Sequence, residues 1–380
     1  MLPPELIEEI LTRLPVKSLL KFRCVSKSWL ALISTPEFIN THLTMSHSNE
    51  DYAHHRLLFG TNQPNIFLRC SINSFFYAPF ISPSILDYPM RYHESCVCIM
   101  GSVNGLICFC AGWEDFIVWN PSIRKFKTFT DFKSRYCSVY GFGYDKLRDD
   151  YKLFIVREEA EIYSVNNESW TTIADFPTPA LNIKGQGVLL NGKLHWSQNR
   201  HSYNGWGIVW IDLTDDGMWG NVQVPCYGEG NFDYTSCVGV LGSYLAVFCI
   251  HNPGTLTDVW VMREYGVHES WEKIFTFNLL NLHNRPSGPT GYEFSSLLCR
   301  SVTSEILFLF GSAFVIFDPR DDSIRHRHVF HHHILSDASI YIESLVWPFL
   351  SEDSWTKQIQ QIPDSFIYES WCPSLARKSS

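Results

Sequence analysis

Hydrophobic residues in the first part of the chain recur at the spacing of an α-helix. Leu6, Ile7, Ile10, Leu11 and Leu14 fall at i, i+1, i+4, i+5 and i+8, which places them on one broad apolar stripe. Two prolines precede the stripe, where they suit the first turn of a helix, and acidic residues follow at the end that the helix dipole makes favourable for negative charge. The pattern predicts an amphipathic helix at the start of the chain.

Pro15 ends that helix, because a proline in a helix interior removes a backbone hydrogen bond. Further apolar residues follow at helical spacing, namely Leu19, Phe22, Val25, Trp29, Leu32 and Ile33. Thr35 is a candidate N-cap in front of Pro36, and we expect a last short turn through Phe38 and Ile39. The segment is therefore predicted to form a small unit of short helices.

A unit of about 45 residues has too small a core to be stable without a metal, a disulfide or a partner. Only Cys24 lies within it, so neither a metal nor a disulfide can supply that stability. Two alternatives follow from the pattern alone. Either the helices cap the downstream domain, or their apolar stripe docks into a groove of another protein.

The rest of the chain is patterned as short strands. Between residues 95 and 329 a plan of four strands repeats five times. The clearest hairpin lies in the third unit, where an Asn191-Gly192 turn separates two alternating apolar runs. A corresponding position in the third strand of each unit recurs every 44 to 57 residues, at Asn120, Ser164, Asp212, Val261 and Asp318.

Four strands per unit at this period are typical of propeller blades. Strand-like segments at 56–61 and 65–70 precede the array, and another at 340–348 follows it. We expect these outer strands to close a sixth blade that combines both ends of the array. The predicted fold class is α+β, a small N-terminal all-α unit followed by an all-β propeller of about six four-stranded blades, with a β-sandwich as the alternative.

The connections between these strands differ in length. Turns after the first and third strands are short, whereas loops after the second and fourth strands are long and rich in aromatic and charged residues. The two sets lie on opposite faces of an up-and-down sheet, and binding residues concentrate in long loops on a rigid scaffold. We therefore predict a target-binding face formed by Trp113, Arg157, Glu158, His201, Tyr203, Trp206, Tyr227, Phe232 and Tyr234. The alternative for each residue is that it packs only its own loop.

Composition narrows the class of protein. Apolar residues make up 45% and charged residues 18% of the 380 positions, which suits a folded chain. The formal net charge is −9 and no basic stripe is present, so we expect no nucleic-acid partner. The longest apolar runs are too short for a membrane span, and the N-terminus lacks the pattern of a secretory signal. We expect a cytoplasmic or nuclear protein with reduced thiols and no membrane partner.

The sequence gives little indication of a catalytic or metal-binding site. Cys96, Cys98, Cys108 and Cys110 form two C-x-C pairs, whereas structural zinc sites more often use C-x₂₋₄-C spacing, and alternate strand residues share one face. The histidine-rich run at 326–333 suits a solvated strand and loop. The sequence holds no nucleophile elbow, H-E-x-x-H, P-loop or G-x-G-x-x-G motif. We therefore expect no catalytic residues, no metal and no cofactor.

The helical segment resembles an F-box of the plant type. The stretch LPPELIEEILTRLPVKSLLKFRCVSKSWLALISTPEFI matches that family's pattern through nearly all of its length. The resemblance implies a unit that docks onto a Skp-type adaptor and, through it, a cullin scaffold. It assigns the adaptor contacts, or the small core behind them, to Leu2, Pro3, Ile7, Ile10, Leu11, Leu14, Leu19, Phe22, Val25 and Trp29. The sequence does not show which of these face the adaptor.

The β-rich part resembles the plant F-box-associated domain of type 1, which is related in description to kelch repeats. The matching stretches occur in the family's order and are GSVNGLICF, WNPSIRKF, GFGYDKLRDDYKL, GVLLNGKLHW, DVWVMREYGVHESWEKIFTF and YIESLVWP. The Gly-Gly doublets of animal kelch repeats are missing, so the predicted propeller is kelch-like only in a loose sense.

Together these resemblances imply a non-catalytic substrate receptor of an SCF-type (Skp–cullin–F-box) ubiquitin ligase, with an unknown target protein. The expected domains are an F-box at 1–45, a connector and first partial blade at 46–94, the propeller at 95–350 and a C-terminal tail at 351–380. Two alternatives within the class are an S-locus-F-box-like receptor for a stylar ribonuclease and a glycan-recognising, lectin-like receptor. An enzyme on a propeller would need a convergent polar cluster, which the sequence does not show.

Overall fold

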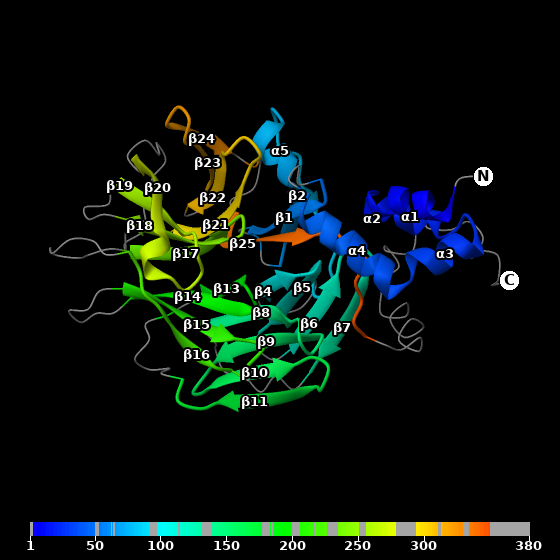
Figure 1. Cartoon of the computed structure of the whole chain (residues 1–380), viewed down its shortest axis with the longest axis horizontal. Coiled ribbons are helices and arrows are strands. Elements are labelled where there is room, and N and C mark those ends of the chain that lie inside the picture. The colour runs from blue at the N-terminus through cyan, green and yellow to red at the C-terminus, as the bar shows by residue number, and fades with distance from the viewer. Residues whose placement is uncertain are drawn as a thin grey trace.

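The structure is a computed structural model, and it shows a helical unit attached to one side of a ring of sheets (Figure 1). The residues that it describes are 3–49, 53–61, 63, 65–91, 97–112, 115–130, 139–176, 183, 185–199, 206–215, 217–225, 235–250, 256–278, 294–310, 313–327, 329 and 334–349. Within these ranges no helix is long and apolar enough to cross a membrane.

The helical unit contains four helices, α1 (Pro4–Thr12), α2 (Val16–Phe22), α3 (Lys27–Ile33) and α4 (Pro36–His47). The Thr35 hydroxyl accepts a hydrogen bond from the backbone N–H of Phe38 at 3.2 Å, so the predicted N-cap is confirmed. The expectation of a short last turn is wrong, because α4 continues to His47. Its inner face keeps Phe38, His42 and Ser46 buried, and this burial extends the helix beyond the cap.

The strands form six sheets in the described part of the chain, and each sheet is one blade of the propeller. Blade 1 is the closing blade, with the order β25 (Ile334–Ile342), β1 (His55–Thr61), β2 (Phe67–Ser71) and β3 (Ser84–Ile85). The last strand of the array thus pairs antiparallel with the first, from His55 opposite Ile342 to Thr61 opposite Ile334. A short helix, α5 (Ile72–Tyr77), follows β2. The predicted closure by strands from both ends is confirmed.

The other blades use consecutive strands. Blade 2 contains β4 (Val97–Val103), β5 (Leu106–Ala111), β6 (Asp115–Asn120) and β7 (Lys125–Phe129). Blade 3 contains β8 (Val139–Asp145), β9 (Asp150–Val156), β10 (Ala160–Ser164) and β11 (Ser169–Ile173), with β12 (Gly185–Gln186) added beside β8. Blade 4 contains β13 (Val188–Leu190), β14 (Lys193–Asn199), β15 (Trp206–Asp212) and β16 (Trp219–Val222).

Blade 5 contains β17 (Thr235–Leu241), β18 (Tyr244–Ile250), β19 (Leu256–Met262) and β20 (Trp271–Asn278), with the single turn η1 (His268–Ser270) before β20. Blade 6 contains β21 (Phe294–Arg300), β22 (Ile306–Phe310), β23 (Ala313–Asp318) and β24 (Ser323–Arg327). Neighbouring blades contact each other through their first strands around the ring. The propeller prediction is therefore confirmed, and the β-sandwich alternative is discarded.

One predicted strand is divided between two blades. The run before the Asn191-Gly192 turn begins at Gln186 and is predicted to be one strand, but Gln186 pairs in parallel with Tyr140 of blade 3, and only the residues from Val188 onwards belong to blade 4. The backbone N–H of Gly187 donates to the carbonyl of Tyr140 at 2.7 Å, which turns the chain between the two blades. A side chain at Gly187 would collide with the ring of Trp196.

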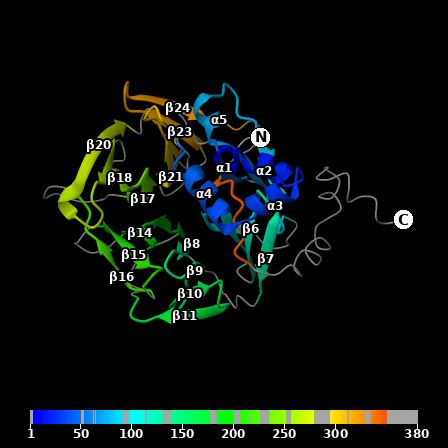
Figure 2. The ribbon, with the colours of Figure 1, turned by 45° about the vertical axis from the view of Figure 1, so that its right-hand side comes forward.

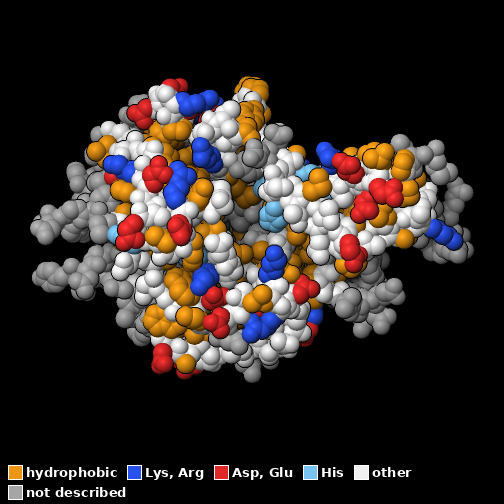
Figure 3. Space-filling view, viewed as in Figure 1, with side chains coloured by type: hydrophobic (Ala, Val, Ile, Leu, Met, Phe, Trp, Pro, Cys, Tyr) orange, Lys and Arg blue, Asp and Glu red, His pale blue; other side chains and the backbone are white. Residues whose placement is uncertain are grey.

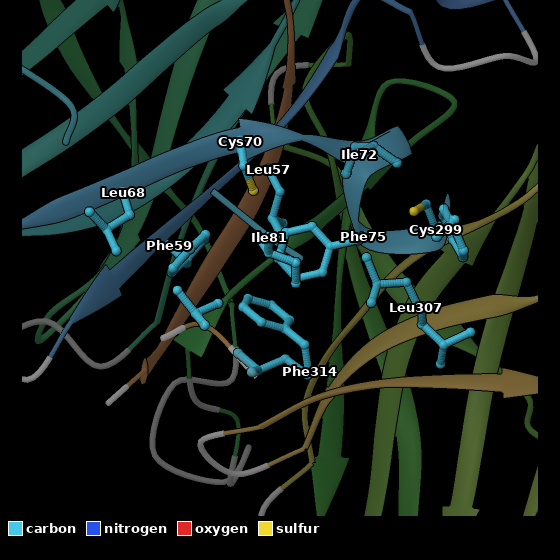
Figure 4. Packing of buried hydrophobic residues seen from close by; sticks show 14 residues of the cluster. Leu57, Phe59, Leu68, Cys70, Ile72, Phe75, Ile81, Cys299, Leu307 and Phe314 are labelled. Atoms are coloured by element: carbon cyan, nitrogen blue, oxygen red, sulfur yellow. The ribbon is translucent and has the colours of Figure 1, made fainter. Parts of the chain in front are cut away.

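Large side chains fill the spaces between blades. A Cβ at Gly101 in β4 would lie 2.9 Å from the Cβ of Phe142 in the next blade, so only glycine allows this close approach. The blade 6–blade 1 boundary is aromatic, since the ring of Phe314 lies 5.2 Å from that of Phe59 and 4.8 Å from that of Phe75. Figure 4 shows these rings packed among aliphatic side chains of both blades. The ring is thus closed by packing as well as by strand pairing.

Candidate functional site

The helical unit has a small core of its own. Leu11, Val16, Leu19, Ile33 and Phe38 are between 0% and 1% exposed and pack into one cluster. The propeller contributes two further side chains to this cluster, the buried Leu345 and the half-buried Ile123. The helices therefore contact the ring on one side only. Figures 1 and 2 both show them beside β6 and β7.

Other apolar side chains of the unit lie in solvent. The exposed fractions are 45% for Leu6, 51% for Ile10, 61% for Val25 and 46% for Leu30. Leu6 and Ile10 are one turn apart on α1, Val25 follows α2, and Leu30 lies on α3. Figure 3 shows hydrophobic side chains on the outer surface of this unit among acidic ones. We call these four residues the apolar surface; exposed apolar side chains that gather on one small unit make it a candidate interaction site.

The structure separates the described predicted adaptor contacts into three groups: exposed, buried and half-buried. Ile10 and Val25 belong to the apolar surface, and Pro3 is also exposed. Leu11 and Leu19 are buried in the helical core. The half-buried residues are Ile7, Leu14, Phe22 and Trp29. Leu2 lies outside the described residues.

Two of the half-buried residues form an aromatic pair. The rings of Phe22 and Trp29 meet edge to face with centroids 5.5 Å apart, which fixes α3 against the end of α2. The Ser26 hydroxyl caps α3 by accepting a hydrogen bond from the Trp29 N–H at 3.1 Å. Leu30 was not among the predicted contacts, although it follows the matching Trp29 directly and is 46% exposed.

Charged groups on the helices are held by neighbours in the same unit. Arg13 donates to the carboxylate of Glu9 one turn earlier at 2.7 Å. The guanidinium of Arg23 donates to the Ile33 carbonyl at 3.2 Å, and burial lowers the pKa of Arg23. Arg23 thus ties the end of α2 to the end of α3.

An extended segment after β25 joins the helices to the ring. The backbone N–H of Glu343 donates to the His54 carbonyl at 2.9 Å, and its carboxylate accepts two hydrogen bonds from Arg56 at 3.1 and 3.0 Å. Ser344 is fully buried, and Leu345 enters the helical core. We call residues 343–346 the closing segment. The predicted strand at 340–348 is wrong in its bounds, because β25 ends at Ile342 and the closing segment leaves the sheet toward the helices.

A single side chain of blade 2 holds this closing segment. Asn120 is 0% exposed, and its Nδ2 donates to the Ser344 carbonyl at 3.1 Å, the Ser344 hydroxyl at 3.2 Å and the Val346 carbonyl at 2.8 Å. The Ser344 hydroxyl in turn donates to the Asn104 carbonyl at 2.8 Å. Asn120 lies in the stretch WNPSIRKF that matches the family, but its partner, 224 positions away, could not be identified from the sequence.

Histidines lie at the junction between the helices and the ring. His42 of α4 is fully buried, and its Nε2 is 2.9 Å from the Leu14 carbonyl. Its ring meets that of His54 edge to face at 5.6 Å. Burial lowers the pKa of His54 to about 4, with smaller contributions from His42 and Arg56, and burial likewise lowers the pKa of His55 to about 4. The junction therefore favours neutral histidines.

The predicted target-binding residues that the structure describes lie on the face of the ring away from the helices. Asn104 of the β4–β5 turn donates to the Tyr151 hydroxyl at 3.2 Å, so this end of β9 lies on the same side as the helices. Arg157 is six residues further along the strand direction, or about 20 Å away at the rise of a β-strand. The helices and the loop at 157–159 thus lie on opposite faces.

Contacts within blade 3 hold Arg157. Its guanidinium lies 2.9 Å from the Glu161 carboxylate and 5.0 Å from the centre of the Trp170 ring. Glu158 beside it is exposed. Trp113, His201, Tyr203, Tyr227, Phe232 and Tyr234 lie outside the described residues, as does the side chain of Trp206. The target-binding assignment stays a prediction.

The cysteines pack in strands. Cys98, Cys108 and Cys110 belong to the cluster between blades 2 and 3, with Cys98 opposite Cys110 across β4 and β5. Burial raises the pKa of Cys108 well above its usual value. Among the residues that the structure describes, no group of three or more His, Cys, Asp or Glu could hold a metal ion.

Comparisons with known proteins agree with this architecture. Residues 1–41 match the F-box domain, and residues 77–346 match the F-box associated beta propeller domain. The chain therefore belongs to the family of F-box proteins with an F-box-associated propeller.

Curated relatives extend the match over most of the chain. An F-box/kelch-repeat protein of Arabidopsis thaliana is 31% identical over 75% of this chain and 82% of its own length. The F-box protein CPR1 of the same plant is 29% identical over 72% of each chain. Among solved structures, that of U3-55K is 10% identical with a TM-score of 0.38, over 71% of this chain and 76% of its own. That last likeness carries no argument about function.

Proposed function

We propose that this chain is the substrate-recognition subunit of an SCF-type ubiquitin ligase. In this proposal α1–α3 dock onto a Skp-type adaptor, and the adaptor connects the chain to a cullin scaffold. The observation that carries the proposal is the apolar surface, because Leu6, Ile10, Val25 and Leu30 are 45–61% exposed on one small helical unit. The F-box match over residues 1–41 supports the identity of the partner.

The propeller face opposite the helices would hold a target protein. Its separation from the helices supports this division, since a partner on one face leaves the other accessible. The chain would perform no chemistry itself. It would keep lysines of the target close to a ubiquitin-charged enzyme, so transfer gains from effective concentration and orientation. Such a protein would act in the cytoplasm or the nucleus.

The test is co-purification of full-length wild-type protein and an Ile10→Asp variant from plant cells treated with a proteasome inhibitor. We expect wild type to retain the Skp-type adaptor, cullin and ubiquitinated target proteins. The variant should lose adaptor and cullin but keep the targets, because its propeller is unchanged. Equal recovery of adaptor with both proteins would contradict the proposal.

A further inference from the structure

The two side chains that the propeller inserts into the helical core have a common support. Leu345 follows Ser344 in the closing segment, and Ile123 lies in the turn between β6 and β7. The two positions are far apart in sequence and belong to different blades. Both depend on Asn120, the last residue of β6.

The two ends of the Asn120 amide serve the two positions separately. Its Nδ2 has three acceptors within hydrogen-bond distance on Ser344 and Val346, the residues on either side of Leu345, so one of its two N–H groups is shared. Its Oδ1 accepts from the backbone N–H groups of Ser122 at 2.8 Å and Ile123 at 3.4 Å. An amide suits this arrangement, because it presents an NH₂ donor group and an acceptor oxygen on one short planar head.

The surrounding residues close the same network. The Ser122 hydroxyl accepts from the Ser344 backbone N–H at 3.2 Å, which links the turn directly to the closing segment. A Cβ at Gly105 would collide with Ser344, so the β4–β5 turn leaves just enough room for it. Asn120 is fully buried, and every hydrogen bond that it makes here lies in a low-dielectric site where an unmade one is costly.

We propose that Asn120 is a positioning residue that couples the propeller to the adaptor-binding helices by fixing Leu345 and Ile123 in the helical core. The core of the helical unit is then complete only when the closing segment is in place. The helices are therefore ordered for adaptor binding only in a protein whose ring is closed. The adaptor part of this inference rests on the proposed function; the coupling between ring and helices does not.

The residues at the corresponding positions of other blades make different contacts, so the role of Asn120 is confined to blade 2. Ser164 of blade 3 donates to the Asp150 carboxylate at 2.7 Å, and Asp212 of blade 4 accepts from Thr214. Both of these contacts stay within their own blade. A substitution at Ser164 is therefore a matched control for one at Asn120.

The main experiment compares full-length wild type with Asn120→Asp and Ser164→Ala by hydrogen–deuterium exchange and by binding of a purified Skp-type adaptor. Aspartate keeps the acceptor for the turn but replaces the donor with an oxygen that faces two carbonyl groups. We expect amides of α1–α4 to exchange at least fivefold faster and the adaptor Kd to rise at least fivefold in Asn120→Asp. Exchange in blades 4 and 5 should stay as in wild type, and Ser164→Ala should leave the helices and the Kd unchanged.

A second pair of variants tests the coupling between the ring and the helices if Asn120→Asp unfolds the whole ring. Leu345→Ala removes only the side chain that enters the helical core, and Val346→Ala is its control because Val346 packs between blades 2 and 3. Faster exchange in α1–α4 with Leu345→Ala but not with Val346→Ala supports the coupling. Helix exchange equal to wild type in both Asn120→Asp and Leu345→Ala overturns it. Wild type that fails to bind any adaptor would refute the proposed function, while the exchange result would still stand.

Discussion

The guanidinium of Arg56 donates two hydrogen bonds to the carboxylate of Glu343, although 287 positions separate the two residues. Arg56 belongs to the first strand of the propeller, and Glu343 follows the last one. The pair therefore fastens the point at which the ring closes and the closing segment departs toward the helices. Paired hydrogen bonds between these groups are directional, so the contact fixes register as well as proximity.

Replacing Glu343 with Gln should destabilise the protein. The pair is partly buried, with side chains 25% and 21% exposed, so we expect a loss of about 1–2 kcal/mol in the free energy of unfolding. The measurement is urea denaturation followed by circular dichroism. Glu9→Gln is the control, because the Glu9–Arg13 pair is 58% and 64% exposed and should be worth about 0.5 kcal/mol or less. Equal losses in both variants would show that the closing pair has no special role.

Gly239 should tolerate no side chain. A Cβ there would lie 2.7 Å from the Cβ of Leu297 in blade 6, so Gly239→Ala should force the two blades apart and cost about 1–3 kcal/mol. Gly207→Ala is the control, since its Cβ would meet only the Gln198 amide oxygen at 3.7 Å. Thermal unfolding should show a lower Tm for the first variant than for the second. A Gly239→Ala protein as stable as Gly207→Ala would contradict the packing between blades.

Stability should fall between about pH 6.5 and pH 4 because of the junction histidines. Burial lowers the pKa of His54 and His55 to about 4, so the unfolded chain, in which histidine has its ordinary pKa, binds more protons than the folded one in this window. Protonation therefore favours unfolding as the pH falls. The low pKa of Asp318, about 2, acts only below this range. Denaturant titrations at pH 7 and pH 5 measure the effect.

The comparison that isolates this effect is wild type against His54→Gln. The variant lacks one of the titrating groups, so its loss of stability from pH 7 to pH 5 should be smaller. His42 and His47 of α4, together with Arg56 and Glu343, are the charged or titratable neighbours that influence this site. If wild type and variant lost the same free energy over this interval, the contribution of His54 would be absent.

Local sequence signals predicted much of the fold. The Asn191-Gly192 turn has φ values of 52° and 74°, as a tight hairpin turn requires, and the Thr35 cap forms as expected. The repeat of four strands predicted the blades, because nearly every blade is made of strands that follow one another in the sequence. Alternation within one strand and the turn after it are local properties, and they can be read without knowledge of the rest of the chain.

The parts that escaped prediction depend on distant residues. Nothing near Leu345 indicates that it completes the core of helices that begin at Pro4, and the triple role of the Asn120 amide depends on a segment more than 200 positions later. The apolar stripe of α1 likewise does not show that Leu11 faces inward while Ile10 faces solvent. Whether a helix position is buried or exposed depends on the neighbour that covers it, and here one neighbour comes from the end of the propeller.

The central claim is that the apolar surface of the helices docks onto a Skp-type adaptor. The most direct measurement is the Kd between purified adaptor and full-length protein, for wild type, Ile10→Asp and Leu147→Asp. Leu147 is 81% exposed on the propeller and serves as the matched control. We expect tight binding by wild type and Leu147→Asp, and at least a hundredfold weaker binding by Ile10→Asp with an unchanged circular dichroism spectrum. Equal affinity of all three proteins would contradict it.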